Sequence, residues 1–94
     1  YPAVEHDLAI VVDNAVTCED LERRITSAGG KLLEGVRLFD VYRDPVRIGK
    51  GKKSMAFALT YRSDDHTLTS EEVEKAHQKI VTKVCKGVNG EVRS

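Results

Sequence analysis

The chain has 94 residues, and its 15 Lys+Arg are balanced by 15 Asp+Glu, so the formal net charge is zero. This length supports one domain with a modest core, and 40% hydrophobic with 32% charged residues is typical of a globular domain. No apolar run approaches the roughly 20 residues of a membrane helix. A zero balance also argues against an indiscriminate binder of nucleic acid, and we expect neither a membrane nor DNA as partner.

In chain order, the first predicted element is a strand over residues 4–13, which is rich in β-branched side chains and stops at Asp13-Asn14. A helix follows, with Thr17 as N-cap and Asp20 as the expected partner in a capping box. Its apolar stripe is Leu21, Ile25 and Ala28, and Gly29-Gly30 ends it.

The second half repeats this order. A strand over residues 32–43 contains Gly35, which indicates a bulge, and a loop leads to a cleanly alternating strand over residues 54–62. Thr69 and Glu72 form a second capping box, for a helix that ends near Gly87. A short strand over residues 91–93 closes the chain. The order βαββαβ predicts an α+β, ferredoxin-like or RRM-like fold: a four-stranded antiparallel sheet with both helices on one face.

The alternation of the strands assigns one sheet face to the core and leaves the other open. The larger apolar set is expected inward: Leu8, Ile10, Val12, Phe39, Val41, Met55, Phe57, Leu59 and Tyr61. The opposite parity collects small and polar residues on the open face: Asp7, Ala9, Val11, Leu38, Asp40, Tyr42, Ser54, Ala56, Ala58, Thr60 and Arg62. A shift at Gly35 would move the second strand by one residue. A flat strip of alanines beside one aromatic ring is a plausible platform for a planar ligand, and sheets of this fold bind RNA bases on that face.

Catalytic and metal-binding patterns are not found in the sequence. Cys18 and Cys85 lie far apart, without a C-x-x-C pair or histidines at ligand spacing, and we expect reduced thiols in a cytoplasmic protein. The three histidines are scattered, and we expect plain surface roles for them. Without a nucleophile–base pair, a phosphate loop or a metal cluster, this chain is predicted not to be an enzyme by itself, with no cofactor of its own.

Several stretches together resemble one family, the ferredoxin-fold anticodon-binding domain at the C-terminus of bacterial phenylalanyl-tRNA synthetase beta subunits. The resemblance covers essentially the whole chain, in order, and implies that the chain is a single-domain fragment of a larger subunit. The matching stretches are Tyr1-Pro2-Ala3-Val4, Asp7-Leu8-Ala9, Ala28-Gly29-Gly30, Leu38-Phe39-Asp40-Val41-Tyr42-Arg43, Gly49-Lys50-Gly51-Lys52-Lys53-Ser54-Met55-Ala56-Phe57, Leu59-Thr60-Tyr61-Arg62, Thr67-Leu68-Thr69 and Glu71-Glu72-Val73.

The resemblance implies a non-catalytic module that docks on the anticodon stem-loop of tRNA(Phe). It implies a parent enzyme, a class II ligase that joins phenylalanine to tRNA with ATP and magnesium. That enzyme is an alpha2-beta2 tetramer in which the alpha subunit carries the aminoacylation chemistry. Expected partners are therefore tRNA(Phe), the rest of the beta subunit and the alpha subunit.

The binding residues follow from base chemistry and from the resemblance. Phenylalanine anticodons begin with guanine, whose N1–H and N2–H a single carboxylate accepts, and both the chemistry and the family point to Asp40. Tyr42 stacks a base, Ser54 holds a base edge or sugar, and Ala9 and Ala56 allow close approach. The expected phosphate contacts are Arg43, Lys50, Lys52, Lys53 and Arg62.

Plainer alternatives stay open at this point. Asp40 would then pair with a neighbouring arginine, Tyr42 would be half-buried at a strand end, and residues 49–53 would form an ordinary solvated loop. For the domain as a whole, the competing functions are an amino-acid-sensing ferredoxin-like module, which would bind its ligand at a dimer edge, and a purely structural interaction domain.

Overall fold

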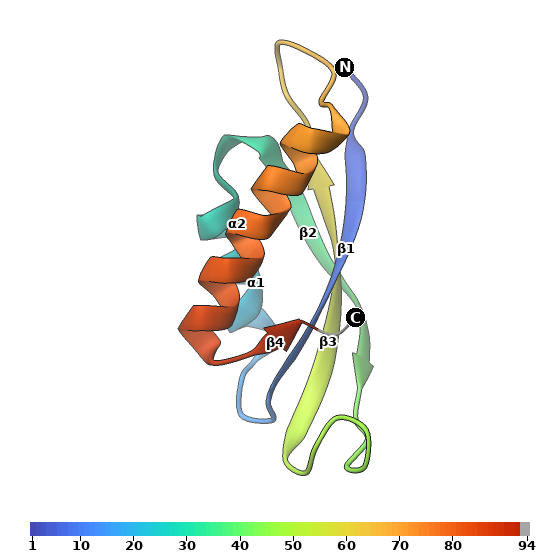
Figure 1. Cartoon of the computed structure of the whole chain (residues 1–94), viewed down its shortest axis with the longest axis vertical. Helices are drawn as coiled ribbons and strands as arrows, with labels where there is room; N and C mark the ends of the chain where they lie inside the picture. Colours follow the sequence, from blue (N-terminus) through green and yellow to red (C-terminus); the bar gives the residue numbers. More distant parts are fainter. Residues whose placement is uncertain (93–94) are drawn as a thin grey trace.

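A computed structural model of the chain describes residues 1–92, which fold into an elongated molecule of 45 × 19 × 18 Å. One antiparallel sheet with the strand order β2-β3-β1-β4 is covered on one side by two helices (Figure 1). The predicted ferredoxin-like βαββαβ fold is thus confirmed; the last residue of the predicted final strand lies outside the described residues. The elements are β1 (Val4–Asp13), α1 (Cys18–Gly29), the 3-10 turn η1 (Gly30–Leu32), β2 (Leu33–Tyr42), β3 (Lys52–Tyr61), α2 (Ser70–Val88) and β4 (Glu91–Val92).

Both helices begin at the predicted threonines. At α2 the full capping box is present, because Thr69 accepts from the N–H of Glu72 while the Glu72 carboxylate accepts from the N–H of Thr69. At α1 Thr17 accepts from the N–H of Asp20 at 3.1 Å. The Asp20 carboxylate instead accepts from Arg23 and Arg24, so α1 has only the threonine half of the predicted box within residues 1–92.

The core lies between the helices and the predicted inward face of β1 and β3. Phe57, Leu59 and Tyr61 are completely buried, as are Ile10 and Val12 of β1, and Leu8 and Met55 are nearly so. The helices supply Leu21, Ile25, Val73, Ile80 and Val84. The core face predicted for these two strands is confirmed.

Strand β2 departs from the prediction because its register with β3 shifts twice, between Leu33 and Gly35 and again between Leu38 and Asp40. The shift at Gly35 was expected; the second one was not. It makes two predictions wrong: Leu38 packs against the core instead of lying on the open face, and Phe39 is 49% exposed instead of inward. Val41 lies opposite Met55 but remains 37% exposed, so it is not a core residue either.

One histidine also differs from expectation. His77 on α2 is 6% exposed, and its Nδ1 lies 2.9 Å from the hydroxyl of the buried Tyr61. Its ring stacks on that of His6 with centroids 3.9 Å apart. A surface role for His77 is therefore wrong, because its helical position places it in the stripe that packs against β1 and β3. Within residues 1–92, no helix is long and apolar enough to cross a membrane.

Candidate nucleic-acid interface

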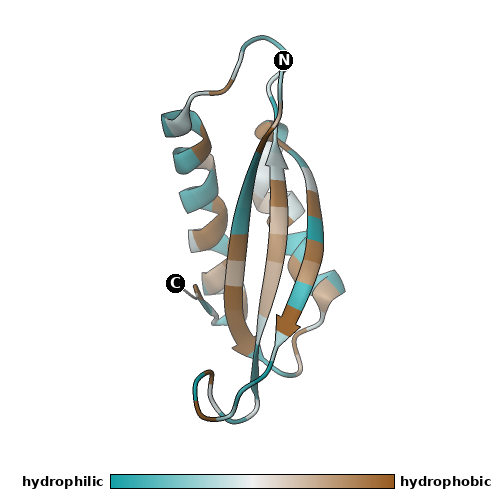
Figure 2. Cartoon of the chain, turned by 90° about the vertical axis from the view of Figure 1, so that its right-hand side faces the viewer, coloured by the Kyte–Doolittle hydropathy of each residue, from teal (hydrophilic) through white to brown (hydrophobic). Residues whose placement is uncertain are grey.

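The open face of the sheet is the face opposite the helices, and Figure 2 looks directly onto it. The strand register arranges it in rows that run across β2, β3 and β1. One row is Asp40, Ala56 and Ala9, and the next is Tyr42, Ser54 and Val11. The predicted base-contacting residues Asp40, Tyr42, Ser54, Ala9 and Ala56 therefore lie together in two adjacent rows.

The second bulge in β2 gives this surface its aromatic edge. Where β2 advances two residues, from Leu38 to Asp40, β3 advances only one, from Phe57 to Ala56. Because Leu38 points to the core, Phe39 points to the open face, and Asp40 does so too because it lies opposite Ala56. An exposed phenyl ring and an exposed carboxylate are thus neighbours on the same side of one strand.

Asp40 has no competing partner among residues 1–92. Its side chain is exposed, and within residues 1–92 no hydrogen bond or ion pair engages its carboxylate. The alternative that Asp40 pairs with a neighbouring arginine is therefore not what the structure shows. Both carboxylate oxygens remain available to two parallel donors of a ligand.

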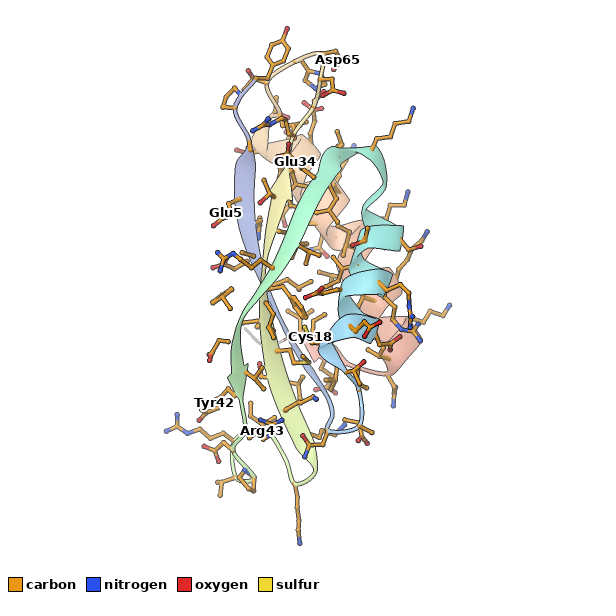
Figure 3. The ribbon with its side chains drawn as sticks, turned by 180° about the vertical axis from the view of Figure 1, so that it is seen from behind. Glu5, Cys18, Glu34, Tyr42, Arg43 and Asp65 are labelled. Carbon is orange, nitrogen blue, oxygen red and sulfur yellow. The ribbon has the colours of Figure 1, made fainter. Side chains whose placement is uncertain are left out.

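Tyr42 is half-buried, and its hydroxyl donates to Oδ2 of Asp44 at 2.9 Å. The other oxygen of Asp44 accepts from the N–H groups of Val46 and Arg47 at 3.0 and 3.2 Å, which orders the start of the loop between β2 and β3. One aspartate thus fixes both the loop and the tip of the tyrosine, and the ring is held at the end of the open face (Figure 3).

Small side chains keep the centre of the face flat. Ser54 is 2% exposed between Tyr42 and Val11, while Ala56 and Ala9 are half-buried. Ala58, in the following row, is flanked by Arg37 and Asp7. A planar group could lie against Ala56 and Ala9, whereas Ala58 is 4% exposed beside the long side chain of Arg37.

The predicted basic residues fall into three groups. Arg43, Lys50 and Lys52 are exposed at or beside the loop that borders the Tyr42 row, and Nε of Arg43 donates to Asn14 at 3.2 Å. Lys53 is 8% exposed and pairs with the core residue Val12, so it lies on the helix side of β3. Arg62 follows the opposite end of β3, where Nη1 lies 3.4 Å from the carboxylate of Glu34.

Two open-face residues, Phe39 and Arg37, were not among the predicted site residues. Arg37 pairs with Ala58 and is exposed, one row beyond Asp40. Both were missed because the second bulge reverses the alternation within β2. A signal exists in the sequence: the apolar residues of this strand change from even positions (Val36, Leu38) to odd positions (Phe39, Val41), and such a change in parity indicates a bulge.

The titratable groups Tyr61 and His77 lie on the helix side of the sheet, and His66 lies in the turn before α2. Burial raises the pKa of Tyr61 to about 12 and lowers that of His77, whose hydrogen-bonded ring faces the core. His66 lies between the carboxylates of Glu72 and Asp65, which raise its pKa and hold the turn before α2. Within residues 1–92, no group of three His, Cys, Asp or Glu is placed to hold a metal ion.

The fold and the open face define a ferredoxin-like α+β domain whose exposed sheet surface suits flat, hydrogen-bonding ligands. The family described as "Ferredoxin-fold anticodon binding domain" matches residues 1–93, so the chain belongs to this family.

Curated proteins named phenylalanine–tRNA ligase beta subunit are among its relatives. Those of Clostridium tetani, Symbiobacterium thermophilum and Bacillus subtilis are 45%, 48% and 51% identical over 99%, 100% and 86% of the chain. The chain spans only 10–12% of the length of these relatives.

Proposed function

We propose that this domain recognises the anticodon loop of tRNA(Phe) through the open face of its sheet and performs no catalysis. The observation that supports this most directly is Asp40: an exposed carboxylate without an intramolecular partner in residues 1–92, in one row with Ala56 and Ala9. Membership of an anticodon-binding family gives independent support.

The first anticodon base is the proposed ligand of Asp40. Guanine presents N1–H and N2–H side by side, and an ionised carboxylate accepts both, whereas adenine presents an acceptor at N1. A bidentate pair of this kind discriminates by about 1–3 kcal/mol against a wrong base. Ala56 and Ala9 give the base room to lie flat against the sheet.

Stacking is proposed for two aromatic rings. Tyr42 lies in the row next to Asp40, and its hydroxyl is tied to Asp44, so the ring is already ordered before RNA binds. Phe39, exposed at the bulge, offers a second ring on the other side of Asp40. A stacked base contributes about 1–3 kcal/mol per aromatic side chain.

Phosphate contacts are proposed for Arg43, Lys50 and Lys52 at the loop, with Arg37 on the face itself. Their exposure and nearness to the two rows support this role. Arg62 lies six residues along β3 from Ala56, which is about 20 Å in a strand, and would meet a different part of the RNA. The structure gives less support to a phosphate contact by Lys53, because this residue is buried on the helix side.

We further propose that the parent subunit belongs to a class II phenylalanine–tRNA ligase with an alpha2-beta2 assembly in the cytoplasm. The names of the relatives support the ligase, and the short span of this chain agrees with a module of a larger subunit. ATP and magnesium would be used by the parent enzyme, away from the domain described here.

A titration of the domain with a tRNA(Phe) anticodon stem-loop tests the proposal. Amide shifts should concentrate at Phe39, Asp40, Tyr42 and Ser54, and binding should weaken as salt rises. Shifts confined to the helices would overturn the proposal.

A stem-loop with adenine in place of the first guanine is the matched ligand. The wild-type domain should bind it more weakly, and Asp40→Asn should reduce that difference, because an amide offers one acceptor instead of two. Equal loss on both stem-loops would mean that Asp40 has only a structural role.

A further inference from the structure

The outer surface of the helix layer is hollowed along the line where α1 and α2 meet. One part of this groove, with a volume of about 440 Å³, is lined by Arg23 and Arg24 of α1 and Lys83 of α2. A second part, of about 410 Å³, is lined by Lys31, Lys75 and Lys79. Ala28 borders both parts, so the two hollows are neighbours, and we call them together the helix groove.

The helix groove is basic along its whole length. From Arg23 to Leu33 the chain contains three basic residues and no acidic one, and residues 75–86 of α2 contain four lysines and no acidic residue. The acidic residues at its two ends already have partners: Asp20 binds Arg23 and Arg24, and Glu72 binds His66 and caps α2. The four lysines Lys31, Lys75, Lys79 and Lys83 are exposed.

The geometry of the groove presents these charges in a row. Lys75, Lys79 and Lys83 are four residues apart on one helix, which places them about 6 Å apart along its axis on one side. On the opposite wall the Arg24 guanidinium donates to Asp20 and lies close to Gly87 of α2. Any side chain at position 87 would meet it, since a Cβ there would be 2.6 Å from Nη1.

We propose that the helix groove binds the sugar–phosphate backbone of an RNA duplex without reading its sequence. Repeated cations on flexible stems match a ligand with one charge at every nucleotide. A protein partner would be anchored by large, exposed apolar or aromatic side chains, and within residues 1–92 the groove offers no aromatic ring: its apolar lining is Ala28, Leu32, Ala76 and Val84, of which none is exposed. This groove and the open face lie on opposite layers of the molecule (Figure 1), so RNA on one surface would leave the other accessible.

The test uses the whole 94-residue chain and a blunt RNA duplex about one helical turn long, which offers no unpaired base to the open face. Binding is followed by fluorescence anisotropy over a salt series. The variant Lys75→Ala/Lys79→Ala/Lys83→Ala is compared with Arg43→Ala/Arg47→Ala/Lys50→Ala, which removes the same number of charges from the loop between β2 and β3. All six side chains are exposed, so both variants should melt like the wild type.

The expected result is that the helix variant binds the duplex about tenfold or more weakly, with a salt slope lower by about 2 to 3, while the loop variant, whose residues are proposed to contact the anticodon loop, loses clearly less. Equal loss in both variants, loss only in the loop variant, or no duplex binding by the wild type at low salt would overturn the proposal. Polyglutamate is the competitor that represents an acidic protein. If it displaced the duplex as well as unlabelled duplex does at the same concentration of negative charge, the groove would not distinguish RNA from acidic protein, and the proposal would be overturned. Asp40→Asn should leave duplex binding unchanged, which separates this result from the anticodon proposal.

Discussion

The two faces of β3 differ in the size of their side chains along the same ten residues. On the helix side stand Met55, Phe57, Leu59 and Tyr61, all at most 2% exposed. On the open side stand Ser54, Ala56, Ala58 and Thr60, none larger than threonine. The first set fills the core between sheet and helices, and the second leaves a flat surface between β2 and β1.

If the open face binds RNA as proposed, stability and recognition are separated here by one residue along the strand. Because successive side chains point to opposite faces, changes at odd and even positions of β3 should affect different measurements. Changes on the helix side should lower the free energy of unfolding. Changes at the partly exposed open-side positions, Ala56 and Thr60, should lower RNA affinity with little effect on folding, whereas Ser54 and Ala58 are 2% and 4% exposed and changes there should affect both.

Phe57→Ala is expected to have the largest effect. The side chain is completely buried between Leu8 and Leu38 of the neighbouring strands, and its removal should lower the free energy of unfolding by about 3–5 kcal/mol. Urea denaturation followed by circular dichroism measures this loss. Phe57→Leu, which retains most of the volume, should lose clearly less; an equal loss in both variants would show that the aromatic ring itself is needed.

Ala56→Leu tests the opposite face at the adjacent position. The added side chain would stand between Asp40 and Ala9, so a base could no longer lie flat, and about 1–3 kcal/mol of stacking free energy should be lost from anticodon stem-loop binding. The melting temperature should stay close to wild type. Ala56→Ser, which adds only one atom, is the matched control and should retain most of the affinity. Wild-type affinity in Ala56→Leu would mean that RNA does not use this row.

The sequence was sufficient to assign the side chains of β3 and β1 to the two sheet faces, because the register between these strands is unbroken over ten residues. It was insufficient to assign the side chains of β2, because two bulges interrupt the alternation between the two faces. Phe39 and Arg37 lie on the open face as a result. The placement of Asp40 and Tyr42 was nevertheless correct, since both follow the second bulge and keep the predicted parity. His77 was missed because a polar residue in an apolar helical stripe is buried only if a partner exists, and that partner, Tyr61, is sixteen positions away.

His77, on the helix side of the sheet, should make the free energy of unfolding depend on pH. Burial lowers its pKa from the usual 6.5, and the nearby His6 acts in the same direction while Glu74 opposes it. Between pH 6.5 and this lower value the unfolded chain binds more protons than the folded one, so stability should fall as the pH drops through that window.

Melting temperatures between about pH 7.5 and 5 measure this effect. His77→Gln, which can still hydrogen-bond the Tyr61 hydroxyl, should lose less stability on acidification than the wild type. His66→Gln is the opposite control: the pKa of His66 is raised by Glu72 and Asp65, so its stabilisation is greatest in acid and that variant should lose more. If His77→Gln and the wild type had the same pH profile, the buried histidine would not be the titrating group.

The smallest effects are expected for alanine variants of Lys52 and Lys53. These two variants also compare the two faces most directly, because the residues are adjacent and chemically identical. Lys52 is exposed, whereas Lys53 pairs with Val12 and is 8% exposed on the helix side. Lys52→Ala should lower the salt slope of stem-loop binding by about 0.7, the value for one lost phosphate contact on a single strand. Lys53→Ala should leave the slope unchanged and instead lower the melting temperature, since its aliphatic stem packs beside the core. The reverse result would mean that RNA approaches the end of β3 from the helix side, and the assignment of recognition to the open face would then fail at this end of the strand.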